Sequence, residues 1–425
     1  MMSVRRFAPV VVLLLVLGVG CSSSDVPDSS SPDPDAPLLL ISIDGLRWDY
    51  LDRHGAPTLS RLAEDGAHVE RLVPVFPSKT FPNHYSIATG LHPSNHGIIA
   101  NNMYDPQMDA TFSLSDRDAV ENPDWWGGEP IWVTAETQGL TAATYFWPGS
   151  EAPVQGVQPT EWFTYDGSVP GATRVDQALA WLDRPPETRP DFLSLYFSRV
   201  DTKGHYHGPT SDSTAVALQE VDGLLQRLLD GLEERGMMDA VNLVVTSDHG
   251  MTPTARERTI VLDDYIDLND VRLIDTNPVA MMEPQDGASA EALVSTLDAA
   301  PHLSAYHRGE VPDTLHFEGH RRIPAVLALA DDRWAIRTQA WMDNHPDWEG
   351  GGAHGYDPRY ENMHTLLVAH GPGFKNDTTV DRLSLVHLYE AMAALLDLEP
   401  APNDGRLEAV RPLLAPDAVP TTTAP

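Results

Sequence analysis

The stretch from residue 74 to 85 reads Pro-Val-Phe-Pro-Ser-Lys-Thr-Phe-Pro-Asn-His-Tyr and gathers several side chains that could do chemistry. Its prolines are incompatible with a helix interior or a central strand, so they predict a rigid loop. Residues 85–90 then predict a short helix that ends at Gly90. The start of a helix directs free backbone N–H groups and a positive dipole end to one point, which favours an anion there. Thr80 lies just before this point and is the candidate nucleophile, although a threonine in an ST-turn or a helix cap would look the same.

Carboxylate and imidazole side chains stand close behind the predicted strands, where they could hold metal ions. Asp201 and His205 are four residues apart, so one helical turn brings them to the same side. The adjacent pair Asp248-His249 is followed by a glycine, which permits the bend that the two need to converge. The glycine-rich loop 350–355 presents a single imidazole. An Asp–His pair alone is usually a surface ion pair, so the prediction depends on the whole set: Asp44, Asp201, His205, Asp248, His249 and His354.

Strands and helices that must position these groups alternate along the chain. Continuous apolar runs are typical of strands buried on both faces of a parallel sheet, and helices are indicated by apolar stripes, starting prolines and stopping glycines. The predicted strands are 37–44, 68–75, 140–147, 191–197, 241–246 and 365–369. The predicted helices are 57–64, 130–138, 172–182, 213–235 and 383–396. The alternation predicts an α/β fold whose mostly parallel central sheet is flanked by helices, and functional groups in such sheets collect beyond the carboxyl ends of the strands.

Two further segments depart from this alternation. Residues 91–106 are rich in polar side chains and predict a loop. Residues 252–349 predict an inserted α+β subdomain, because several strand-like pieces surround a single helix. These pieces are 259–265, 325–330 and 334–338, and the helix is 288–298.

The first 36 residues indicate that the chain is exported, and they are not part of the predicted folded domain. Arg5 and Arg6 precede an apolar run, 8–20, which is too short to span a bilayer and suits a signal peptide, residues 1–20. Cys21 follows it as the only cysteine of the chain, so it resembles the lipidated residue of a bacterial lipoprotein on the periplasmic face of the cell envelope. A simple cleaved secretory signal is the alternative.

Two terminal segments have the composition of disordered chain. Residues 21–36 are rich in serine, proline and aspartate and predict a tether, and residues 415–425 predict a tail. The 425 residues carry a formal net charge of −34, which opposes binding to nucleic acid polymers. A small anionic substrate would need a local reversal of this field, and bound divalent cations supply one.

A set of motifs carries a resemblance to a known family. The segments are 44–45, 79–85, 89–99, 101–106, 147–150, 201–205, 247–251 and 354–357. In types and order they resemble the nucleotide pyrophosphatase/phosphodiesterase family of the alkaline phosphatase superfamily. The resemblance implies a three-layer sandwich fold and a catalytic domain over residues 37–414. It also implies hydrolysis of phosphodiester and pyrophosphate bonds of nucleotides, with release of nucleoside 5′-monophosphates.

By the same resemblance, two zinc ions share the site. Asp201, His205 and His354 would hold one ion, and Asp44, Asp248, His249 and the oxygen of Thr80 would hold the other. These are residue types that zinc binds. Thr80 would form a covalent intermediate, and Asn101 would donate to a phosphoryl oxygen, with the backbone N–H groups of Thr80 and Phe81 helping.

The resemblance also implies a pocket for the nucleotide, whose base would stack on aromatic side chains. The residues at the matching positions are Phe81, Leu114, Trp147, Pro148, Glu151, Tyr165 and Tyr196. Glu151 stands where aspartate is usual, and Ala119 stands where some members have a lysine, so base preference is open. The bland alternative for the aromatics is core packing. No role is indicated for Lys79.

Three rival functions remain at this stage. The first is a phosphodiesterase acting on choline phosphoesters or lysophospholipids, since aromatic side chains also suit a cationic headgroup. The second is a phosphomonoesterase, for which no additional arginine near Thr80 is evident. The third is a non-enzymatic binding lipoprotein. The sequence indicates no oligomeric state, and it predicts membrane contact only through the lipid on Cys21.

Overall fold

The computed structural model describes residues 36–285 and 287–418. Cys21, the predicted signal peptide and the tether up to residue 35 lie outside this range. Among the described residues, no helix combines the length and the apolarity needed to cross a membrane. The predicted tail begins inside the range with a short 3-10 helix, Pro416–Ala418, and its remaining residues lie outside.

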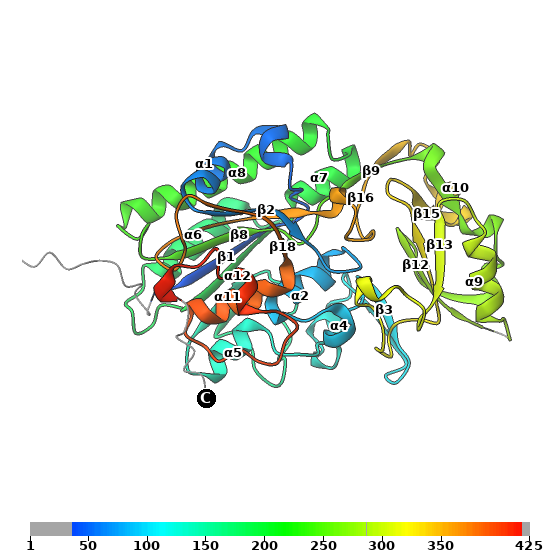
Figure 1. Cartoon of the computed structure of the whole chain (residues 1–425), viewed down its shortest axis with the longest axis horizontal. Helices are drawn as coiled ribbons and strands as arrows, with labels where there is room; N and C mark the ends of the chain where they lie inside the picture. Colours follow the sequence, from blue (N-terminus) through cyan, green and yellow to red (C-terminus); the bar gives the residue numbers. More distant parts are fainter. Residues whose placement is uncertain (1–35, 286, 419–425) are drawn as a thin grey trace, which may run out of the picture. The chain divides into compact units, whose positions relative to one another are not determined.

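One eight-stranded sheet forms the centre of the fold (Figure 1). Its strands in spatial order are β18 (Thr378–Ser384), β2 (Ala67–Val73), β17 (Thr365–His370), β8 (Asn242–Thr246), β1 (Leu38–Ile43), β7 (Phe192–Phe197), β5 (Ala142–Tyr145) and β6 (Glu161–Phe163). The pairs on either side of β1 are parallel, and only β17 runs against its neighbours β8 and β2. The predicted mostly parallel sheet is therefore confirmed.

Helices cover both faces of this sheet, which gives three layers (Figure 1). One face carries α1 (Pro57–Asp65), α6 (Gly171–Leu182), α7 (Arg199–His207) and α8 (Asp212–Glu234). The other face carries α2 (Thr80–Thr89), α5 (Ile131–Thr137) and α11 (Leu388–Leu395), with the short helices α3 (Pro93–His96), α4 (Arg117–Glu121) and α12 (Leu407–Val410) nearby. Each face has its own apolar core, built from strand residues and the helix residues that face them. Burial of apolar surface on both faces is what stabilises such a sheet.

The helix α2 begins five residues earlier than the sequence predicts, at Thr80 rather than residue 85. Pro82 is the third residue of the helix, where a backbone N–H has no partner within the helix, so its ring does not break the turn. The side chain of Asn83 secures this start, because its Oδ1 accepts from Val75 N at 2.8 Å and its Nδ2 donates to the carbonyl of Lys79 at 2.8 Å. The loop prediction was wrong for residues 80–84.

Other boundaries differ for local reasons. The predicted loop 91–106 contains α3 and the first strand of a hairpin, β3 (Asn102–Asp105) with β4 (Ala110–Ser113). The predicted closing helix starts later, at Leu388, because residues up to 384 extend β18 along β2.

The chain between β8 and β17 builds a second sheet, β11 (Val271–Asp275), β12 (Val279–Pro284), β14 (Val326–Ala330) and β13 (Leu303–His307), in that spatial order. Helix α9 (Ala290–Asp298) packs on β13 and β14, and an apolar core separate from the two cores of the large sheet fills the space between them. The antiparallel pair β9 (Thr252–Ala255) and β16 (Gly350–Ala353) joins the two ends of this segment. Near it lie β10 (Thr259–Val261), β15 (Ala335–Arg337) and α10 (Gln339–Asn344). The strand predicted at 259–265 therefore covers only three of its seven expected residues, because a 3-10 helix follows at Leu262–Asp264.

Candidate active site

The predicted carboxylates and imidazoles meet at the carboxyl ends of β1, β7 and β8. Nε2 of His249 lies 2.9 Å from Oδ2 of Asp248 and 3.4 Å from Oδ1 of Asp44. Oδ1 of Asp201 lies 3.3 Å from Nε2 of His205, one turn further along α7. We call the six residues Asp44, Asp201, His205, Asp248, His249 and His354 the carboxylate–imidazole cluster.

His354 joins the cluster from the loop that follows β16. Its Nε2 lies 3.0 Å from Nε2 of His205 and 3.7 Å from Oδ1 of Asp201. Its ring stacks on that of His249 with centroids 3.5 Å apart. Close packing of β16 against α7 makes this approach possible, since a side chain on Gly351 would collide with the carbonyl oxygen of His205. The glycines of this loop therefore bring His354 to the cluster.

The three imidazoles of the cluster are oriented by backbone carbonyls. Nδ1 of His205, His249 and His354 lies 2.9 Å from the carbonyl oxygens of Gly352, Gly250 and Ser78, respectively. A carbonyl only accepts, so each Nδ1 carries a proton, and Nε2 is the nitrogen of each ring that faces the cluster. Without protons on Nε2, the three lone pairs would converge and repel one another unless a cation lay between them, so this arrangement suits a metal ion.

The carboxylates of the cluster also lack partners that a cation would supply. Oδ1 of Asp44, Oδ1 of Asp201 and Oδ2 of Asp248 are buried and have no hydrogen-bond donor among the described residues. Burial, then the charges of Asp248 and Asp201, raise the pKa of Asp44 well above its usual value. Burial would also raise the pKa of Asp201, but His205 and His354 outweigh it and lower that pKa to about 2. Buried polar atoms require partners, and a divalent cation would satisfy these oxygens.

Among the described residues, ligand atoms within 4.8 Å of one another form three overlapping groups. They are Asp201, His205 and His354; Asp44, Asp201 and His249; and Asp44, His84 and Asp248. The donor set of imidazole nitrogens and carboxylate oxygens fits zinc. The first group is the set that the sequence assigns to one ion, whereas no group within the described part of the chain brings together Asp44, Asp248 and His249, the carboxylates and imidazole assigned to the other.

His84 is the residue of this region that sequence reasoning missed. Its Nδ1 lies 2.9 Å from the carbonyl oxygen of Thr80 and 3.3 Å from Oδ2 of Asp248, and its Nε2 lies 2.7 Å from Oγ of Ser42. Since the carbonyl only accepts, Nδ1 of His84 carries a proton and is not free to bind a metal, although it lies at ligand distance from Asp44 and Asp248. The spacing of four residues from Thr80 was the available signal.

Thr80 stands at the first position of α2 with its hydroxyl at the cluster. Its Oγ1 lies 3.3 Å from Nε2 of His249. Asn101 lies beside it, and its Oδ1 accepts from the N–H of Phe81 at 3.0 Å. This contact leaves the amide NH₂ group of Asn101 to donate, and it occupies the Phe81 N–H that the sequence assigned to a phosphoryl oxygen.

The predicted pocket residues fall into two groups. Phe81 is half-buried, and Leu114 and Tyr165 are 40% and 38% exposed, so all three are accessible. Tyr196 is buried, and its hydroxyl donates to Oδ2 of Asp44 at 2.5 Å. We call the region beside Phe81, Leu114, Tyr165 and Tyr196 the base slot, after the role that the sequence predicts for these residues.

The remaining pocket residues, Trp147, Pro148 and Glu151, are buried. Trp147 is only 1% exposed and donates from Nε1 to the carbonyl of His84 at 3.2 Å, so it helps to hold α2 in place. Glu151 forms an ion pair with Arg117.

Lys79, which had no predicted role, forms a buried ion pair with Asp275 of β11. The two side chains are 5% and 10% exposed. The pair connects the residue before Thr80 to the four-stranded sheet, across nearly two hundred residues of sequence. It leaves Lys79 engaged with a carboxylate rather than available to a phosphate.

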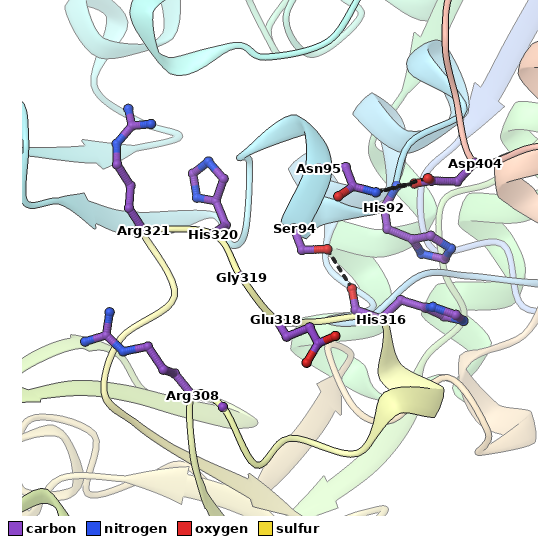
Figure 2. Close-up of a pocket in the computed structure, with 11 residues that line it drawn as sticks. His92, Ser94, Asn95, Arg308, His316, Glu318, Gly319, His320, Arg321 and Asp404 are labelled. Carbon is purple, nitrogen blue, oxygen red and sulfur yellow. Dashed lines mark hydrogen bonds between the residues drawn. The ribbon is translucent and has the colours of Figure 1, made fainter.

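A separate hollow of about 750 Å³ lies beyond the other end of α2 (Figure 2). There, the rings of His92 and His316 stack with centroids 4.3 Å apart, and Asn95 donates to Asp404. The ten residues of α2 separate this hollow from Thr80 by about 15 Å of helix at 1.5 Å per residue. The hollow is therefore not part of the cluster.

Comparisons with known proteins agree with this geometry. A family model described as type I phosphodiesterase/nucleotide pyrophosphatase matches residues 38–357. The human ectonucleotide pyrophosphatase/phosphodiesterase family member 1 is 39% identical over 397 residues, which cover 91% of this chain and 42% of the human protein. A venom phosphodiesterase of Crotalus durissus collilineatus is 40% identical over 397 residues, 91% of this chain and 47% of the venom protein. The chain thus spans less than half the length of these two relatives.

A solved structure of murine ectonucleotide pyrophosphatase/phosphodiesterase 5, an inactive threonine-to-alanine variant in complex with AMP, superposes with a TM-score of 0.84. It is 34% identical, and the match covers 89% of this chain and 99% of the murine one. The sandwich fold that the sequence resemblance implies is thereby confirmed. The chain belongs to the type I phosphodiesterase/nucleotide pyrophosphatase family.

Proposed function

We propose that this chain is a zinc-dependent phosphodiesterase and pyrophosphatase that releases nucleoside 5′-monophosphates from nucleotides and their derivatives. The observation that carries the proposal is the position of Thr80, whose hydroxyl lies 3.3 Å from Nε2 of His249 at the edge of the carboxylate–imidazole cluster. The relatives named as pyrophosphatases and phosphodiesterases support the same reaction class.

In this proposal Asp201, His205 and His354 hold one zinc ion. Asp44, Asp248 and His249, with the oxygen of Thr80, hold the other. The three unpartnered carboxylate oxygens and the three oriented Nε2 atoms support metal binding, and the grouping of Asp201, His205 and His354 supports the first set of ligands. Zinc, when bound, would lower the pKa of the threonine hydroxyl and stabilise charge on the leaving oxygen.

The first half-reaction transfers the nucleotidyl group to the protein. Oγ1 of Thr80 attacks the phosphorus, the bond from phosphorus to the leaving oxygen breaks, and the hydroxyl proton is lost to solvent. The side-chain NH₂ of Asn101 donates to a non-bridging oxygen, because its Oδ1 is already held by Phe81 N. The N-terminal end of α2 adds a positive dipole at the same point.

The second half-reaction returns the protein to its starting state. A water molecule attacks the phosphorus of the covalent intermediate, the bond to Oγ1 of Thr80 breaks, and the oxygen regains a proton. The nucleoside 5′-monophosphate then leaves. His84 keeps Oγ1 in place throughout, because it bonds the carbonyl of Thr80 and thereby fixes the first turn of α2.

The base of the nucleotide would lie in the base slot, between Phe81 and Tyr165. Two accessible aromatic side chains and an exposed Leu114 support this placement, since large apolar side chains are rarely exposed together without a partner. The AMP complex of the murine relative supports a mononucleotide as product. In this proposal the buried residues Trp147, Pro148 and Glu151 hold the residues of the base slot in place.

A zinc count combined with a substrate panel tests the proposal. The panel contains ATP, the 4-nitrophenyl ester of thymidine 5′-monophosphate, a phosphocholine ester and a phosphomonoester. We expect two zinc ions per chain and preferential release of nucleoside 5′-monophosphate. Preferential hydrolysis of the phosphocholine ester would support the rival lipid phosphodiesterase, and a chain that stays inactive with zinc present would overturn the proposal.

We further propose export of the chain with a lipid on Cys21, a residue outside the described range. The support is the sequence of residues 5–21. The substitution Cys21→Ser should release the protein from the membrane fraction. Residues 37–414 would then form the catalytic domain, with 252–349 as its inserted subdomain.

A further inference from the structure

The first wall of the base slot is continuous with the residues that would hold the phosphoryl group. The rings of Phe81 and Phe112 lie 5.8 Å apart, edge to face. Leu114 follows Phe112 at the end of β4, and its N–H donates to the carbonyl oxygen of Asn101 at 3.0 Å. This wall therefore reaches from Thr80 to an exposed leucine at the rim.

The second wall comes from a different part of the chain. Tyr196, at the end of β7, bonds Asp44 through its hydroxyl, and its ring centroid lies 6.0 Å from that of Tyr165. The hydroxyl of Tyr165 lies 3.3 Å from Oγ of Ser198. This wall therefore also starts at the cluster and ends at an exposed aromatic ring.

One ion pair, between a buried carboxylate and a partly exposed guanidinium, connects the outer ends of the two walls. Arg117, three residues after Leu114, pairs through Nη2 with Oε2 of Glu151. The other oxygen of that carboxylate, Oε1, accepts from the N–H of Tyr165 at 3.3 Å. The carboxylate of Glu151 therefore contacts both walls. It accepts from the backbone of Tyr165 in the second wall, and it pairs with Arg117, which follows Leu114 of the first wall.

The backbone around this pair is itself well fixed. The side chain of Asp116 caps α4 by accepting from the N–H groups of Asp118 and Ala119, so Arg117 starts from a defined helical turn. The side chain of Glu151 is only 5% exposed and that of Arg117 is 35% exposed, and partial burial lowers the pKa of the Arg117 guanidinium. Exposed ion pairs contribute little, but the carboxylate of Glu151 is buried, so loss of its cation leaves that charge without compensation. Removal of Arg117 should therefore move the residues that Glu151 holds.

We propose that Arg117 is a specificity-determining positioning residue, which fixes the spacing between Leu114 and Tyr165 through Glu151 and so selects a flat aromatic group, a nucleobase. This inference depends on the proposed nucleotide substrate and goes beyond it. The residue acts on the part of the substrate that does not react. Its loss should weaken binding of the base and leave the chemistry at Thr80 unchanged.

Two diesters with the same leaving group separate these effects. One is the 4-nitrophenyl ester of thymidine 5′-monophosphate, and the other is methyl 4-nitrophenyl phosphate, which has no base. With the zinc-loaded full chain, Arg117→Met should raise KM for the nucleotide ester about tenfold, the equivalent of about 1.4 kcal/mol, with kcat unchanged. The kcat/KM for the methyl ester should not change. Arg117→Lys should restore a large part of the lost affinity, because it keeps the charge.

Two further variants control for folding. Arg227→Met removes an exposed pair with Asp176 on α8 and α6 and should leave both esters unaffected. The double variant that combines Arg117→Glu with Glu151→Arg rebuilds the pair in reverse and should lower KM again relative to Arg117→Met.

The outcomes are distinct. An unchanged KM of Arg117→Met for the nucleotide ester overturns the inference, and so does an equal fall of kcat/KM for both esters, which indicates general disruption. A wild-type chain that prefers the methyl ester, or hydrolyses neither, contradicts the proposed function itself. The wild-type comparison thus tests the function, and the variants test Arg117.

Discussion

The hydroxyl of Tyr196 donates a hydrogen bond of 2.5 Å to Oδ2 of Asp44, which joins the base slot to the carboxylate–imidazole cluster. The other oxygen, Oδ1, has no donor among the described residues and faces the cluster. Outer contacts of this kind orient a metal ligand and tune its basicity. The same residue thus has a ring in the slot and a hydroxyl at the cluster.

We predict that Tyr196→Phe lowers zinc affinity while it preserves the apolar wall of the slot. Loss of such a contact typically reduces metal affinity about 10–100-fold. Competition with a chromogenic chelator measures the change, and Phe146→Leu, one strand away, serves as a core control. Equal zinc affinity in Tyr196→Phe and wild type would show that the hydroxyl does not position Asp44.

His84 allows a second prediction, on turnover. His84→Asn removes the imidazole that links the carbonyl of Thr80 to Oγ of Ser42, so the start of α2 is less well fixed. A misplacement of about 1 Å at a reacting group can cost about 100-fold in rate. We expect kcat to fall by about this factor with a small change in KM, as steady-state kinetics would show. A rise in KM alone would argue against a role in placing the nucleophile.

The Lys79–Asp275 pair predicts a stability effect. Lys79→Met leaves the buried carboxylate of Asp275 without its cation, which for buried pairs costs about 3–5 kcal/mol. The double variant with Asp275→Leu should recover most of this free energy of unfolding, because both charges are then absent. Urea unfolding of the three proteins measures the effect. If Lys79→Met is as stable as wild type, the pair does not tie β11 to the start of α2.

The ion pairs of Asp105 lead us to predict that the free energy of unfolding falls in acid. Burial alone would raise its pKa, but the guanidinium groups of Arg321 and Arg322 hold the pKa of Asp105 well below its usual range. A carboxylate with a lowered folded-state pKa contributes stability that is complete above its unfolded-state pKa of about 3.9 and is lost as the pH falls below it. Wild type should therefore lose more unfolding free energy between pH 7 and pH 3 than Asp105→Asn. Parallel loss in both proteins would contradict this assignment.

The sequence predicted the cluster better than it predicted the surroundings of the nucleophile. Strand ends are marked by continuous apolar runs, so local pattern alone places Asp44, Asp201 and Asp248 at one edge of the sheet. The start of α2 could not be placed in this way, because Pro82 signals a break unless its position in the first turn is known. His84 was missed because its task depends on Ser42 and Asp248, which are distant in sequence.

Pairs that join remote segments escaped prediction for the same reason. Nothing near Lys79 or Arg117 in the sequence identifies Asp275 or Glu151 as the partner. The strands β11, β12 and β13 were also missed, since short strands of mixed polarity resemble loops when read singly. Their partners in the four-stranded sheet define them, and pairing is not visible in local pattern.

The central claim is that Thr80 becomes covalently linked to the nucleotide. The most direct measurement is mass spectrometry of the peptide that contains Thr80, after acid quenching of zinc-loaded protein during turnover of ATP. We predict a nucleotidyl group on Thr80 in the wild type, and neither that group nor turnover in Thr80→Ala, which should still bind zinc through the six residues of the cluster. Turnover by Thr80→Ala at the wild-type rate would contradict the account.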